Sequence, residues 1–171
     1  PGASLPRRWR GRFRAVPRCL VCVAFGPHSL RMDVGISYAG SRVAISARAV
    51  ADMLAAAAEA GGHEACGLLF GVEGRIVEAS VAANVSGEPW HRFEIEPAHL
   101  FDAHRRDRAG PLRLIGCWHS HPNGRAQPSA TDRAGVADMG WLWLIVADGR
   151  ISAWKPDAAG FAPVALRDSG S

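Results

Sequence analysis

The chain has 171 residues, of which 48% are hydrophobic and 21% are charged. This composition is typical of an ordinary folded domain and excludes a disordered chain, a collagen-like repeat or a coiled coil. At this length a chain buries about two-thirds of its unfolded surface around one core, and it is too short for two ordinary domains.

The net charge of +4 is concentrated at one end of the chain. Residues 1–31 hold seven arginines and no acid, which leaves 13 basic and 16 acidic side chains, a net charge of −3, for the remainder. The basic balance therefore gives no reason to expect nucleic-acid binding by the body. We expect residues 1–32 to be a disordered extension or a translated leader, with Met32 as the true start, and residues 33–171 to form the domain.

The apolar run at 19–25 falls short of a secretory signal, because Pro17 precedes it and Gly26-Pro27 ends it. No stretch reaches the roughly 18 apolar residues that a membrane span needs. The Cys19-x-x-Cys22 pair offers half of a zinc knuckle at most. Since the cysteine spacing indicates no disulfide framework, we expect a reduced, cytoplasmic setting.

Apolar periodicity, capping residues and Gly/Pro breaks predict the elements of the body. In chain order they are a strand at 42–46, a helix at 47–60, strands at 66–72, 75–85 and 91–96, a helix at 97–109, a strand at 112–119, a helix at 130–139, strands at 141–148 and 151–155 joined by a Gly149-Arg150 turn, and a strand at 161–166. This mixture predicts an α/β domain around one central sheet.

Metal-binding and proton-transferring side chains gather in HSHPNGRAQPSATD, residues 119–132. If the preceding strand continues through this point, His119 and His121 face one side and Ser120 the other. Two imidazoles at this spacing suit zinc, and a catalytic site needs a third ligand and an open position. Asp132, at the start of the next helix, can be that ligand. Taken singly, the histidines could face solvent or cap the turn, and Asp132 could be an ordinary helix-start acid.

Hydrolysis at such a centre also needs a group that moves the proton of water and a donor for the developing oxyanion. Glu64, between Gly61-Gly62 and an apolar strand, is the candidate for the first task, although most glutamates are surface residues. Ser129 is the candidate for the second, and as a helix N-cap it also has a purely structural alternative.

Together, Glu64, the run His119-Ser120-His121-Pro122 and the spacing on to Ser129-x-x-Asp132 resemble the JAMM signature of MPN-domain metalloproteases. The segments EACGLLFG, FEIEP and LIGCWHSHP are also similar to that family, so the resemblance spans about residues 41–166.

The resemblance implies a single MPN domain with cytidine-deaminase-like α/β/α layers around a curved mixed β-sheet. It also implies one Zn²⁺ per chain with a bound water, His119, His121 and Asp132 as metal ligands, Glu64 as general acid/base and Ser129 as oxyanion partner. The implied reaction is hydrolysis of a peptide or isopeptide bond after the C-terminal Gly-Gly of a ubiquitin-like or sulfur-carrier β-grasp protein. The short body has no room for the long inserted loops of eukaryotic deubiquitinases, so ubiquitin itself is not expected.

Two alternatives remain open from the sequence: a non-catalytic MPN scaffold that binds partners, and a zinc amidase acting on small or cell-wall peptides. A zinc deaminase is not expected, because its His-x-Glu and Pro-Cys-x-x-Cys motifs are missing. Trp90 and Phe93 could line an approach to the metal or pack in the core. Cys117 is expected to be a buried apolar residue, and Trp141 and Trp143 are expected to pack.

Overall fold

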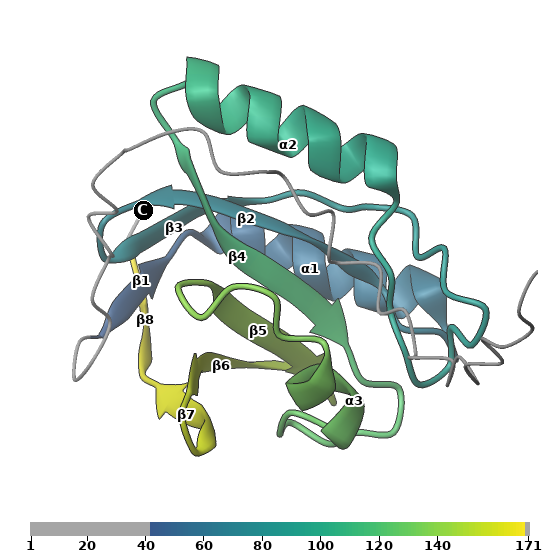
Figure 1. Cartoon of the computed structure of the whole chain (residues 1–171). Helices are drawn as coiled ribbons and strands as arrows, with labels where there is room; N and C mark the ends of the chain where they lie inside the picture. Colours follow the sequence, from purple (N-terminus) through teal and green to yellow (C-terminus); the bar gives the residue numbers. More distant parts are fainter. Residues whose placement is uncertain (1–41, 170–171) are drawn as a thin grey trace, which may run out of the picture.

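A mixed β-sheet runs through the centre of the molecule in a computed structural model that describes residues 42–169 (Figure 1). Its eight strands follow the order β7-β6-β5-β4-β2-β3-β1-β8. The strands are β1 (Val43–Ile45), β2 (Cys66–Val72), β3 (Arg75–Ala79), β4 (Arg113–Ser120), β5 (Leu142–Ala147), β6 (Arg150–Asp157), β7 (Gly160–Val164) and β8 (Leu166–Asp168). The expected extension at 1–32, its boundary and the Cys19/Cys22 pair lie outside the described residues.

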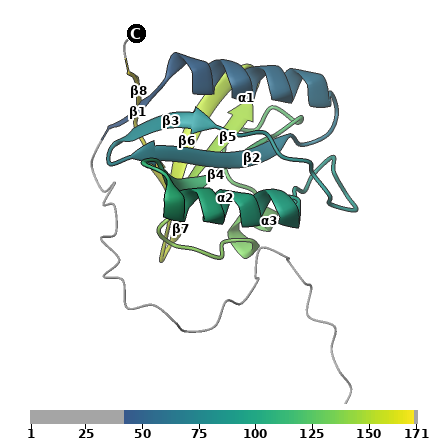
Figure 2. The same ribbon diagram turned by 90° about the horizontal axis from the view of Figure 1, so that it is seen from above.

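Helix α1 (Ala47–Ala60) covers one face of the sheet, and α2 (Pro97–Ala109) and α3 (Ala130–Ala134) lie on the other (Figure 2). The alanine-rich sequence of α1 favours a helix, and the Ser46 side chain caps it by accepting a hydrogen bond from the Ala49 amide at 3.1 Å. It ends at Gly61, whose φ of 61° suits glycine. The expected α/β/α layering is thereby confirmed. None of the helices in residues 42–169 is long and apolar enough to cross a membrane.

Alternation along the central strands divides the apolar residues into two cores. Leu69 of β2 and Trp118 of β4 belong to the core beneath α1, with Met53 of that helix. Cys66 of β2 and Cys117 of β4 belong to the core on the α2 side. His119 lies two residues after Cys117, so its side chain points to the same face of the sheet. The metal-binding side chains of the loop are therefore expected on the face that α2 and α3 cover.

The sheet is curved strongly enough for its two edges to meet. β7 pairs with β6 at one edge and β8 pairs with β1 at the other, yet only Ala165 separates these two strands. Two residues span at most about 7 Å, so the edges lie side by side at this corner. A single strand at 161–166 was therefore a wrong prediction, because the chain changes partner at Ala165.

Two other predicted strands are also wrong in extent. The strand expected at 75–85 ends at Ala79, and 91–96 contains only an isolated bridge between Asn84 and Ile95. Main-chain bonds continue from Ser80 to Leu68 and from Ala82 to Cys66, but beyond Ala79 they form only isolated bridges. The Ser80 hydroxyl also bonds both the amide and the carbonyl of Leu68.

The helix expected at 130–139 ends after five residues, at Ala134. The Gly135 amide closes the turn on the carbonyls of Thr131 and Asp132. In the hairpin, Ala147 pairs with Arg150, so the turn is Asp148-Gly149 and lies one residue earlier than predicted. Both turn residues have positive φ, 48° and 69°, as a two-residue type I′ turn requires.

Candidate metal centre

The two histidines of the loop converge, as their spacing predicted. β4 carries His119 into the interior, and His121 follows immediately after the strand, with their Nε2 atoms 2.9 Å apart. His119 is 0% exposed. Ser120 lies on the other face, where its hydroxyl accepts a hydrogen bond from the Ala65 amide at 2.8 Å.

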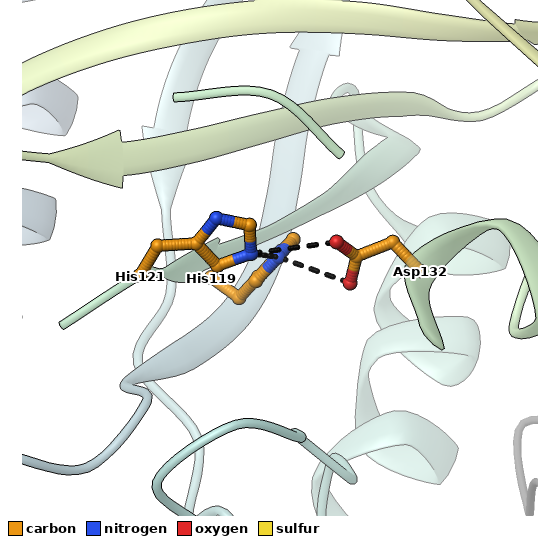
Figure 3. Close-up of side chains that lie close together, drawn as sticks. All are labelled: His119, His121 and Asp132. Atoms are coloured by element: carbon orange, nitrogen blue, oxygen red, sulfur yellow. Dashed lines mark hydrogen bonds and ion pairs between the residues drawn. The ribbon is translucent and has the colours of Figure 1, made fainter. Parts of the chain in front are cut away.

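Asp132 completes the group from α3 (Figure 3). Its Oδ1 lies 3.2 Å from Nε2 of His119 and its Oδ2 lies 3.3 Å from Nε2 of His121. A capping box holds the carboxylate: the Ser129 amide donates to Oδ2 at 2.6 Å, and the Ser129 Oγ accepts from the Asp132 amide at 3.0 Å. Burial would raise the pKa of Asp132, but hydrogen bonds from both histidines outweigh it and hold that pKa well below its usual range.

These three residues can together hold a cation, because one ligand atom of each lies within 4.8 Å of the others. Nδ1 of His121 lies 2.6 Å from the Arg125 carbonyl, which can only accept, so this nitrogen carries the proton. In the protonated ring Nε2 of His121 donates to Asp132, whereas in the neutral ring, the form that binds a metal, Nε2 presents a lone pair toward Nε2 of His119 and an anionic carboxylate. Converging acceptors of this kind need a cation or a shared proton between them, and two imidazoles with one carboxylate form a donor set that suits zinc.

The two ring environments differ. Burial lowers the pKa of His119 and keeps it in the neutral form that binds metals. For His121, burial also lowers the pKa, but bonds to Asp132 and the Arg125 carbonyl outweigh it and raise the pKa. Phe93 stacks on the His119 ring at a centroid distance of 4.4 Å. Nδ1 of His119 finds no hydrogen-bond partner among the described residues, so aromatic packing holds this ring.

Glu64 lies just before β2 and is 5% exposed, so it is not the surface residue that glutamate usually is. Cys66, two residues on, pairs with His119 across β2 and β4, which brings Glu64 to the same end of the sheet. Burial raises the pKa of Glu64 to about 7, while the charge of His121 lowers it and that of Asp132 raises it. The carboxyl is thus close enough to the group to share its electrostatics.

The other predicted residues have the following places. Ser129 caps α3, as predicted. Cys117 is buried in the apolar core and is not among the three ligating residues, in agreement with its predicted apolar character.

The predicted aromatic residues differ in their distance from the centre. Trp143 packs beside His119 with ring centroids 6.0 Å apart. Trp90 is 54% exposed and lies edge-on against His91, whereas Phe93 lies against the centre.

A cavity of about 170 Å³ opens next to His119 on the α2 side. Phe93 and Trp143, the residues that contact the His119 ring, form part of its wall. Ile95, Leu100 and Cys117 contribute further apolar surface. The centre therefore adjoins a space of the size and polarity that accept an apolar side chain.

Two groups that bond residues of the site were not predicted from the sequence. The Arg125 carbonyl fixes the tautomer of His121, and no side-chain pattern indicates a main-chain acceptor. Asn84 bonds the Glu64 carbonyl at 2.8 Å. Asn84 falls inside the strand predicted at 75–85, where a polar residue among apolar neighbours was the only available signal.

The layered fold and the buried His-x-His and Asp group define the JAB/MPN class of domains. The family described as prokaryotic homologs of the JAB domain matches residues 46–157, and the chain belongs to this family. The JAMM-type metallopeptidase family expected from the sequence is thus confirmed.

Known relatives agree with this assignment. The chain is similar to the desampylase of Haloferax volcanii, with 34% identity over 55% of this chain and 71% of the relative. It is also similar to the desampylase of Pyrococcus furiosus, with 33% identity over 53% of this chain and 65% of the relative. A JAB1/MPN domain protein from Archaeoglobus fulgidus shares the fold, with a TM-score of 0.50, 21% identity, and coverage of 74% of this chain and all of that one.

Proposed function

We propose that the protein is a zinc-dependent isopeptidase that hydrolyses the bond after the C-terminal Gly-Gly of a ubiquitin-like or sulfur-carrier β-grasp protein. One observation carries the proposal: two imidazole nitrogens and a carboxylate converge in a buried pocket where only a cation or protons can balance their lone pairs. Two desampylases are among the relatives, which favours a ubiquitin-like substrate.

His119, His121 and Asp132 would hold one Zn²⁺ per chain, with an open position for water. Bound there, the ion supplies Lewis-acid polarisation of a carbonyl and lowers the pKa of water to near 7.

Glu64 moves the proton in this mechanism. As a buried carboxyl with a raised pKa, it accepts a proton from the attacking water and returns it to the leaving amine. The Ser129 hydroxyl donates to the developing oxyanion. Its oxygen already accepts from the Asp132 amide, and this leaves its own proton available for donation.

The surroundings fit an extended protein tail. Two glycines carry no bulk, so they can pass close to the buried centre, and the adjoining cavity accepts an apolar side chain farther along the tail. A complete ligand set argues against a non-catalytic scaffold. A zinc amidase acting on small peptides would use the same centre but gain nothing from a carrier protein's folded body. The buried free thiols Cys66 and Cys117 accord with action in the cytoplasm.

The test uses β-grasp carrier proteins fused through Gly-Gly to a lysine side chain or to a reporter. We expect cleavage after the second glycine, loss of cleavage with a chelator, recovery with Zn²⁺, and slow turnover with full zinc content in Glu64→Gln. Equal turnover of a free short peptide ending in Gly-Gly would favour the amidase, and a zinc-loaded protein that cleaves neither substrate would favour the scaffold.

A further inference from the structure

Asn84 connects Glu64 to the wall of the metal centre. It lies half-buried in the segment that leaves β3, far from Glu64 in sequence but in contact with it in space. Its side-chain nitrogen donates to the Glu64 carbonyl at 2.8 Å and to the Arg92 carbonyl at 3.1 Å. Its side-chain oxygen accepts from the amides of Ser86 and Glu94, each at 3.0 Å.

These four bonds use the full capacity of a carboxamide, which has two N–H donors and two acceptor lone pairs. They also settle its orientation, because main-chain carbonyls can only accept and main-chain amides can only donate. Asparagine is therefore the one small side chain whose chemistry matches all four partners. Aspartate would set a carboxylate against two carbonyls, and serine would supply a single donor.

The segment that Asn84 organises, residues 84–94, holds the centre at two points. The Glu64 amide donates to the Pro89 carbonyl at 2.6 Å, so both main-chain groups of Glu64 are bonded to this loop. At its other end, Phe93 stacks on the ring of His119. One loop thus positions the main chain of the proton-transferring residue and packs against a metal ligand.

We propose that Asn84 is a positioning residue, which fixes the Glu64 main chain so that the carboxyl is aimed at the water beside His119, His121 and Asp132. This inference rests on the proposed function, since it assigns Asn84 an effect that acts through Glu64. The three ligands lie at the end of β4, on the residue that follows it and on α3, all outside residues 84–94, so we expect loss of the Asn84 bonds to disturb proton transfer while the metal stays bound.

The experiment compares Asn84→Asp and Asn84→Ser with Ser86→Ala as the matched control. Ser86 lies in the same loop, and its hydroxyl accepts from the nearby Glu88 amide at 3.2 Å and from no other group within residues 42–169. We expect both Asn84 variants to keep one equivalent of zinc and a similar KM, while kcat falls roughly 10–100-fold, the usual effect of losing an outer partner of a metal site. Ser86→Ala should retain the wild-type kcat.

A double-mutant cycle with Glu64→Gln separates positioning from general damage to the fold. If Asn84 acts through Glu64, adding Asn84→Asp or Asn84→Ser to Glu64→Gln lowers kcat no further. Three results would overturn the proposal: effects of the two substitutions on kcat that multiply in the double mutant, loss of zinc from the Asn84 variants, or an equal fall of kcat in Ser86→Ala. If neither Asn84 variant folds, the side-chain amide protons of Asn84 in the wild-type protein decide by NMR: slow exchange with solvent supports the two donated bonds, to the carbonyls of Glu64 and Arg92, and fast exchange refutes the proposal.

The two proposals fail in different ways. Wild-type turnover by Glu64→Gln alone refutes the proposed mechanism. Wild-type turnover by both Asn84 variants, with Glu64→Gln inactive, refutes the positioning of Glu64 and leaves the mechanism standing.

Discussion

The ionised Glu64 carboxylate lowers the free energy of unfolding when no cation is bound. Burial raises its pKa from 4.5 to about 7, so the folded state favours the protonated carboxyl. The protonated carboxyl contributes its whole stabilisation of the folded state below about pH 4.5, and this stabilisation is lost as the pH rises through about 7. Glutamine has the same shape without the charge. In chelator-treated protein at pH 8, Glu64→Gln should therefore exceed the wild type in stability by about 3 kcal/mol.

Urea unfolding at pH 5 and pH 8 measures this difference. The raised pKa of His121 also makes the metal-free protein less stable toward pH 8, but that contribution is present in both proteins and largely cancels. Glu64→Gln should show the smaller loss between the two pH values. Parallel losses in the two proteins would mean that the carboxyl is solvated and ordinary.

Asp132 serves both the centre and the start of α3, and one substitution separates these tasks. Asp132→Asn keeps an oxygen that can accept from the Ser129 amide but removes the negative charge between the histidines. Outer-shell substitutions alone cost roughly 10–100-fold in metal affinity, so loss of a direct ligand should cost at least that much. Competition with a fluorescent zinc chelator measures the affinity. Cys117→Ala, a buried change outside the ligand set, should bind zinc as the wild type does.

At the scale of elements, β4 fits between its neighbours only because Gly116 has no side chain. A Cβ at this position would overlap the Leu142 carbonyl on β5, its register partner. We expect Gly116→Ala to destabilise the fold by about 3 kcal/mol or more, since backbone rather than a flexible side chain must yield. Urea unfolding is the measurement, and Gly87→Ala, where a Cβ meets open space, should differ little from wild type. Equal stability of the two variants would show that the strands separate at little cost.

The elements that the sequence predicted well are those with a strong local signal. The alanine-rich α1, with Ser46 before it and Gly61 after it, has the predicted limits. The His119-x-His121 pair followed from strand geometry alone. These features depend on neighbours in the chain.

The wrong predictions concern segments whose structure depends on residues far away in the sequence. Residues 80–96 have strand-like apolar residues, but their main-chain pairing is limited to isolated bridges, and the side chains of Ser80 and Asn84 bond further main-chain groups of other segments. The split at Ala165 follows from closure of the sheet, which couples strands more than 100 residues apart, β1 and β8. The buried state of Glu64 likewise depends on Pro89 and Asn84, which the chain brings to it from a separate loop.

For the whole molecule, metal binding adds to folding stability because the centre joins a central strand to a separate helix. The three ligand groups assemble only in the folded chain, so a bound ion stabilises the native state by mass action. At 100 times its dissociation constant it contributes about 2.7 kcal/mol, which for this chain length corresponds to a Tm shift of roughly 5–10 °C.

Thermal scans with chelator and with added Zn²⁺ measure this shift. The wild type should melt lower with chelator and recover with zinc, and Asp132→Asn should respond far less. A wild-type Tm that ignores the chelator would count against a metal bound by the native state at this place.

The shared carboxylate of Asp132 has a spectroscopic consequence. Its Oδ2 accepts a 2.6 Å hydrogen bond from the Ser129 amide while facing His121. A short bond to an anion shifts the amide proton resonance downfield, and a cation that draws charge from the same oxygen weakens that bond. The Ser129 resonance should therefore move upfield as zinc is titrated in, so that one backbone proton reports the occupancy of the centre without any added label.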